Sequence, residues 1–135
     1  MTKHSRFSAL LIASTVLFLI CGHGRPATSG ESKNKDMAFE IHGRLSIYNG
    51  NPAYRIWIIG TNRILGIPGG DLEPAEMPEA LHELFTDTFI IVYGDFTVTP
   101  LTEYEPGVMQ YVRIDSAKNL LVYSAGKLVK RLAKI

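Results

Sequence analysis

Apolar and polar residues alternate along much of the chain after residue 37, and this period of two is typical of β-strands that bury one face. In the segment 39–47 (Phe-Glu-Ile-His-Gly-Arg-Leu-Ser-Ile) the odd-numbered positions are apolar or glycine and the even-numbered positions are polar. The run 88–98 is apolar almost throughout, so we expect burial on both of its faces. The pattern predicts strands at 39–47, 54–59, 63–67, 88–98, 108–114 and 120–123.

Turn-forming residues separate these segments. Asn49-Gly50 is a strong hairpin signal, because both residue types accept a positive φ. Asp115-Ser-Ala-Lys-Asn119 is expected to be a further turn, and Ser124-Ala-Gly-Lys127 favours a last hairpin. After it we expect either an amphipathic turn or a terminal element in 127–135 that packs its apolar side on the domain.

One helix is predicted between the third and fourth strands. Pro78 suits the first helical position. Leu81, Leu84 and Phe85 follow with the spacing of an apolar helical stripe.

The order of strands and helix, with Gly43 inside the long first strand, resembles the OB-fold, a small Greek-key barrel. This resemblance rests on element order and glycine placement. We predict a mainly β fold: a small antiparallel, OB-like barrel of five to six strands with one short helix between the third and fourth strands. Another small barrel, or a rolled antiparallel sheet packed on one helix, is the alternative.

The first two dozen residues have the three parts of a secretory signal peptide. Lys3 and Arg6 lie in a short basic region, which precedes the 12 apolar or small residues of 9–20. That stretch is shorter than the roughly 20 residues that cross a bilayer, so we expect export to the periplasm or the medium and no stable membrane anchor. The predicted organisation is a signal peptide at 1–24, a flexible linker at 25–37 and one β-rich domain at 38–135.

Cys21, directly after the apolar stretch, introduces lipidation as an alternative fate. The bulky Ile20 before it disfavours that modification and favours ordinary cleavage. Cys21 is the only cysteine. Cleavage after it therefore leaves a domain without a disulfide or a thiol nucleophile.

The net charge of +1 provides no general field for nucleic acid, and we predict no nucleic-acid partner. Charge is nevertheless uneven, because no lysine or arginine lies between Arg63 and Arg113, where nine acidic residues fall. The segment 127–135 holds four basic residues. We expect the acidic and basic regions to complement each other within the fold or to aid solubility.

No pattern indicates catalysis or a cofactor. The predicted domain has two histidines, His42 and His82, and no Gly-x-Ser-x-Gly motif accompanies them. His82 with Glu79 provides at most half a metal site. The turn 67–71 lacks the lysine of a phosphate-binding loop. We therefore predict no enzymatic activity, no cofactor and no metal.

Arg55 and Trp57 share one face of the second predicted strand, with Arg44 near them on the first strand and Tyr48 beside the hairpin. Strands two and three form the usual ligand face of OB-like barrels, and an aromatic ring beside an arginine can stack on a sugar or a peptide group. We predict a binding module for a saccharide, peptide or protein partner that uses these four residues. The alternatives are a Trp57 covered by its own chain, with Arg55 over it, and a structural or envelope-associated accessory protein without a small-molecule ligand.

Overall fold

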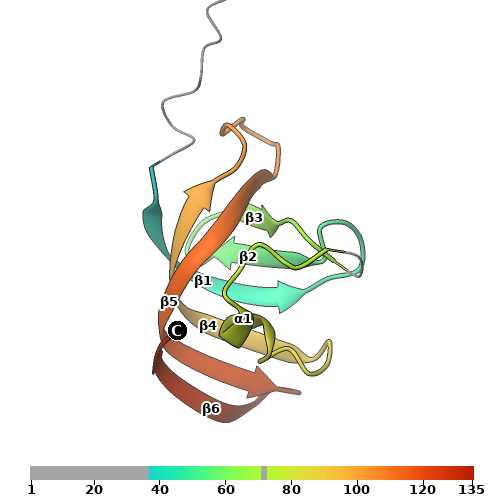
Figure 1. Cartoon of the computed structure of the whole chain (residues 1–135), viewed down its shortest axis with the longest axis vertical. Coiled ribbons are helices and arrows are strands. Elements are labelled where there is room, and N and C mark those ends of the chain that lie inside the picture. Colours follow the sequence, from blue (N-terminus) through green and yellow to red (C-terminus); the bar gives the residue numbers. More distant parts are fainter. Residues whose placement is uncertain (1–36, 71–72) are drawn as a thin grey trace, which may run out of the picture.

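The computed structural model describes residues 37–70 and 73–135, and these residues form a mainly β structure (Figure 1). The predicted signal peptide, Cys21 and the linker up to residue 36 lie outside the described residues. No helix in the described ranges is long and apolar enough to span a bilayer. The elements are β1 (Phe39–Ile47), β2 (Tyr54–Ile58), β3 (Ile64–Ile67), α1 (Glu79–His82), β4 (Ile90–Pro100), β5 (Gln110–Ser124) and β6 (Lys127–Lys134).

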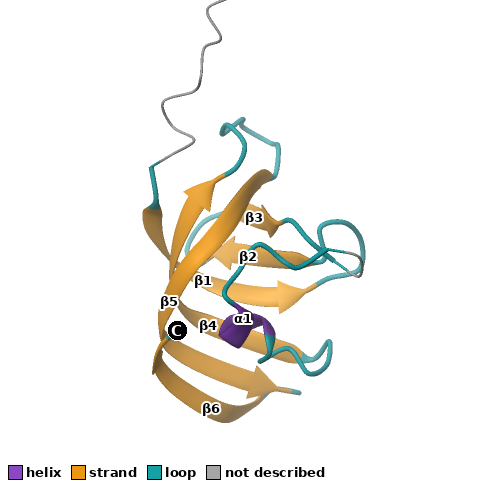
Figure 2. Cartoon of the chain, in the orientation of Figure 1, coloured by secondary structure: helices purple, strands orange, loops and turns teal. Residues whose placement is uncertain are grey.

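The six strands form one sheet in the order β3-β2-β1-β4-β5-β6, with antiparallel neighbours (Figure 2). β3 also pairs with β5, in parallel. The pairings of the first five strands therefore return to their starting point, whereas β6 extends the sheet beyond β5. The predictions of a mainly β chain and of a short helix between the third and fourth strands are confirmed.

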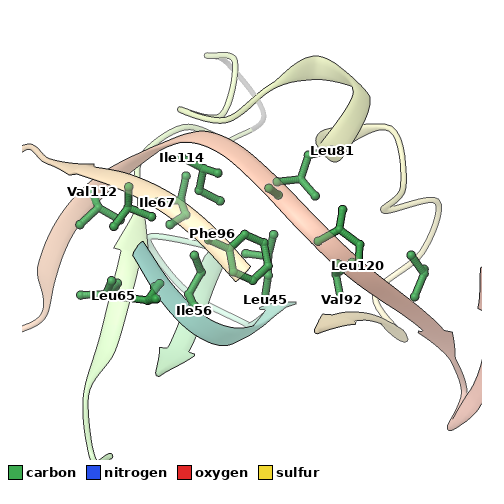
Figure 3. Close-up of a cluster of buried hydrophobic side chains, with 14 of the residues drawn as sticks. Leu45, Ile56, Leu65, Ile67, Leu81, Val92, Phe96, Val112, Ile114 and Leu120 are labelled. Atoms are coloured by element: carbon green, nitrogen blue, oxygen red, sulfur yellow. The ribbon is translucent and has the colours of Figure 1, made fainter. Parts of the chain in front are cut away.

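A single apolar core fills the space between these strands (Figure 3). Alternate positions of β1, β2 and β4 point into it, so that Leu45 of β1, Ile56 of β2 and Phe96 of β4 are fully buried. Leu81 of α1 enters the same core. Full burial of one such side chain stabilises the fold by roughly 1.5–3 kcal/mol.

Two glycines allow β1 and β4 to bend closely over the core. Gly43 and Gly94 lie directly opposite each other in the β1–β4 pair. A Cβ atom on Gly43 would collide with Ile56, and one on Gly94 would collide with Leu120. The inward side of both strands at this point therefore accepts no side chain.

The structures of β4 and β5 differ from two of the predictions. β4 is buried on one face only, because its residues alternate between buried and half-buried along its whole length. The predicted turn at 115–119 is wrong, since these residues lie inside the single long strand β5. Irregularities in the β4–β5 register and the positive φ of Asn119 (54°) accommodate the turn-forming residues within that strand.

The helix and the C-terminal segment differ in detail from the prediction. Pro78 is the residue before α1 and not its first residue, because its ψ of 136° is extended. The predicted last hairpin is confirmed, with Ala125 and Gly126 at φ values of 46° and 79°. The segment after it is the strand β6 and not an amphipathic turn.

Candidate binding face

The four residues predicted to bind a ligand form one continuous row of contacts. The guanidinium carbon of Arg44 lies 5.2 Å from the centre of the Trp57 ring. Arg44 Nη2 donates a hydrogen bond of 2.9 Å to the Tyr48 hydroxyl. The guanidinium carbon of Arg55 lies 5.3 Å from the centre of the Tyr48 ring. We call Arg44, Tyr48, Arg55 and Trp57 the arginine–aromatic row.

Strand register and two turns position this row. Arg44 and Trp57 are direct partners in the β1–β2 pair, so their side chains leave the same outer face of the sheet. At one end of β2, Arg55 Nε donates to the Pro52 carbonyl oxygen at 3.0 Å. At the other end, Trp57 Nε1 donates to the Thr61 carbonyl oxygen at 2.8 Å. The row is therefore anchored to the turns before and after β2.

The stacking arrangement differs from the prediction of a Trp57 ring that stacks on a ligand and from the alternative in which Arg55 lies over Trp57. Arg44, and not Arg55, lies over Trp57, while Arg55 lies over Tyr48. One face of the half-buried Trp57 ring is thus already occupied by an arginine of the same chain. A ligand that used this face of the ring would have to displace Arg44.

Arg44 is a cation surrounded by aromatic groups. Its hydrogen bond with Tyr48 raises the pKa of the Arg44 guanidinium above the usual value, against the lowering effect of burial, and Tyr93 adds to the rise. Neither Arg44 nor Arg55 takes part in an ion pair within the described residues. The ion pairs there are His42–Asp95, Arg113–Asp115 and Lys118–Glu40.

Two adjoining hollows lie beside the row, on the outer face of β1, β4 and β5. The first, of about 340 Å³, is lined by residues that include Arg44, Ser46, Tyr48, Phe89, Ile91 and Gly126. The second, of about 500 Å³, is lined by residues that include His42, Ile91, Tyr93, Asn119, Tyr123 and Gly126. Because they share Ile91 and Gly126, we call the two hollows together the outer groove.

Tyr93 and Tyr123 are groove residues that sequence reasoning missed. Their rings meet edge to face, with centroids 5.6 Å apart. Tyr93 is also the β4 partner of Arg44 in the sheet. An alternation of apolar and polar residues along β4 would have identified its outward positions. That alternation is absent, because outward residues such as Ile91 and Tyr93 are themselves apolar or aromatic.

Two buried polar atoms at the first hollow have no hydrogen-bond partner among the described residues: Arg44 Nε and Ser46 Oγ. Ser46 is only 7% exposed. Buried polar groups of native proteins are almost always paired. Arg44 Nε and Ser46 Oγ are therefore exceptions to this rule.

A second arginine–aromatic contact lies near the β4–β5 loop. The guanidinium carbon of Arg63 lies 4.5 Å from the centre of the Tyr104 ring, and Arg63 Nη2 donates to Gln110 Oε1 at 3.0 Å. Gln110 in turn donates to the Thr102 carbonyl oxygen at 3.0 Å. These groups satisfy one another, so the contact braces the loop, even though a hollow of about 540 Å³ lies beside it.

The two histidines in the described part of the chain have structural partners. His42 Nδ1 lies 2.8 Å from Asp95 Oδ1, and His82 Nε2 lies 3.0 Å from the Tyr54 hydroxyl. Over residues 37–70 and 73–135, no three or more histidine, cysteine, aspartate or glutamate side chains are grouped so as to hold a metal ion.

No protein-family model matches the chain, and no curated protein or solved structure is significantly similar to it.

Proposed function

We propose that the chain is a small exported binding module without enzymatic activity, which recognises a saccharide, peptide or protein partner through the arginine–aromatic row and the outer groove. One observation carries this proposal: Arg44 and Arg55 are held on aromatic rings without an acidic partner in the described residues, and Arg44 lines the outer groove. Guanidinium groups in this setting are well suited to bind oxygen acceptors of a ligand.

We further infer that the sheet is an OB-like barrel. The circuit of pairings β1-β2-β3-β5-β4, the helix between β3 and β4 and the inward-facing glycines of β1 and β4 support this inference. On the usual ligand face over β2 and β3, the backbone of Gly66 is closely covered, because a Cβ atom there would lie 2.7 Å from Pro52 and 2.9 Å from Met109. The proposed ligand surface therefore avoids β3 and extends from Arg55 and Trp57 of β2 toward β1 and β4, where the outer groove lies.

A structural or envelope-associated accessory protein is the second candidate function. It is favoured by β6, which lies at the end of the sheet and, among the described strands, pairs only with β5. None of its basic side chains forms an ion pair with a described residue: Lys127, Lys130, Arg131 and Lys134. Such an edge can contact a partner without a small ligand.

The test uses Trp57, the only tryptophan, as a reporter of the row. The chain without its first 24 residues is screened against neutral and acidic oligosaccharides and peptides by intrinsic fluorescence, and hits are measured by calorimetry. We expect at least one hit whose affinity falls about tenfold or more in Arg44→Ala, because a hydrogen bond to a charged group contributes roughly 1.5–3 kcal/mol.

Arg113→Ala is the matched control, since Arg113 is an exposed strand arginine paired with Asp115 away from the row. The affinity of Arg113→Ala for each hit should equal that of the unmodified chain. Equal binding by Arg44→Ala, Arg55→Ala and Arg113→Ala would reject the row as the binding site and leave the accessory function.

A further inference from the structure

We infer that the outer groove binds an acidic oligosaccharide, whose carboxylate is held by Arg44 and Ser46 and whose sugar rings lie over Tyr93 and Tyr123. This inference rests on the proposed function and names the ligand class of the same site. It is carried by the charge of the groove, by its unpartnered donors and by its position on the sheet.

The groove selects against cations. Its ionisable lining residues are His42, Arg44, Tyr48, Tyr93 and Tyr123, and none of them is acidic, although the chain has 13 aspartates and glutamates. The Asp95 carboxylate, which contacts the lining residues His42 and Asn119, is already hydrogen-bonded to both of them.

The unpartnered donors fit a carboxylate. The Nε and Nη groups along one edge of an arginine match the two oxygens of a carboxylate. Arg44 Nε and Ser46 Oγ are buried and lack a partner among the described residues, and both residues line the first hollow. A carboxylate reaches this edge when the guanidinium moves away from the Tyr48 hydroxyl, and it then satisfies both donors.

The position of the groove favours a saccharide over an extended peptide. An extended peptide commonly binds by adding a strand to a free sheet edge. β1, β4 and β5 are each paired on both sides, so the groove offers no free backbone edge. Its lining instead combines tyrosine rings with short polar side chains such as Ser46, Thr88 and Asn119. Rings of this kind can cover the apolar face of a sugar while polar neighbours bind its hydroxyls.

The size of the groove agrees with this ligand. Its two hollows, of about 340 and 500 Å³, each fall within the range of small-molecule sites, roughly 300–1,000 Å³. One hollow holds the carboxylate at Arg44, and the adjoining one has the tyrosine pair for the neighbouring sugar rings.

The experiment measures calorimetric affinities of the chain without residues 1–24 for trimers of galacturonate and mannuronate, for their methyl esters and for hexaglutamate. The methyl esters keep the sugar rings and remove only the charge. We expect a uronate trimer to bind at least tenfold more tightly than its methyl ester and than hexaglutamate.

Variants localise the binding. Arg44→Lys keeps the charge but loses the Nε edge, and Ser46→Ala loses the hydroxyl, so each should weaken uronate binding about tenfold or more. Arg113→Lys is the matched control and should bind as the unmodified chain does. Thermal unfolding of every variant verifies that it is folded.

Equal affinity for acid and methyl ester would overturn the carboxylate assignment, and tighter binding of hexaglutamate would overturn the saccharide assignment. In both cases the proposed binding function stands if Arg44→Ala abolishes binding. Failure of both uronates to bind would overturn this inference, whereas the broader ligand screen separately decides the proposed function.

Discussion

At the scale of single residues, Gly43 and Gly94 explain how a short chain builds a curved sheet. They oppose each other on the inward side of the two central strands, where Ile56 and Leu120 approach the backbone. An interior packed as closely as a crystal of small molecules has no free volume for an added methyl group. The absence of a side chain at these positions is therefore what the local packing requires.

Gly94→Ala should lower the free energy of unfolding by about 1–3 kcal/mol, because the new methyl group overpacks the core against Leu120 and the Lys118 carbonyl oxygen. Gly70→Ala is the matched control, since a Cβ atom at Gly70 meets nothing within 4 Å. The control should change stability by less than about 0.5 kcal/mol. Urea unfolding measures both values, and equal stability of the two variants would contradict this account of the core.

Asp95 is expected to make stability depend on pH. Hydrogen bonds from Asn119 and His42 lower the pKa of the Asp95 carboxyl in the folded chain, against the effect of burial. The unfolded chain then binds more protons around the ordinary aspartate pKa of about 3.9, so its population grows as the pH falls. This contribution to stability is complete above pH 3.9 and is lost as the pH falls through the lowered pKa.

The measurement compares unfolding free energies of the unmodified chain and of Asp95→Asn between pH 6 and pH 2. The difference between them should shrink as the pH falls below about 4, since the protonated carboxyl has lost its charge-dependent contribution. A constant difference over that interval would show that Asp95 acts only through packing.

At the scale of elements, the sequence predicts a strand well when its two faces differ in polarity. β1 was predicted with its observed bounds, because its alternation between apolar and polar residues is unbroken. β5 was predicted as two strands, because Asp115 and Asn119 favour turns locally. Pairing with β4 and β6 on its two sides outweighs that local preference, and bulges absorb it.

The difference in polarity between the two faces of a strand also explains how much of the candidate site was predictable. The period of two and the hairpin after β1 are enough to bring Arg44, Tyr48 and Trp57 together. They do not reveal Tyr93 and Tyr123, because an outward tyrosine in an apolar strand has the same pattern as a core residue. The unpartnered atoms of Arg44 and Ser46 depend on atomic packing and have no sequence signal.

At the scale of the whole molecule, the closed circuit of pairings divides the sheet into two parts. Each of the first five strands pairs with two other strands of this circuit, and all five contribute buried residues to the core. β6 has one neighbour among the described strands, and its residues are exposed except for the half-buried Leu132. Its contribution to the core is limited to Leu132 and the following Ile135, which pack against the buried cluster.

This division predicts that β6 opens more easily than the rest of the sheet. Local opening requires less free energy where few apolar contacts must be broken. Backbone amides of β6 should therefore exchange with solvent deuterium at least tenfold faster than those of β4, which is paired on both sides and alternates fully buried residues with half-buried ones. β3, although only four residues long, should exchange like β4, because it lies within the circuit. Hydrogen exchange measured residue by residue distinguishes the three strands. Equal protection of the β6 and β4 amides would contradict this prediction, because it would mean that the whole sheet opens as one unit.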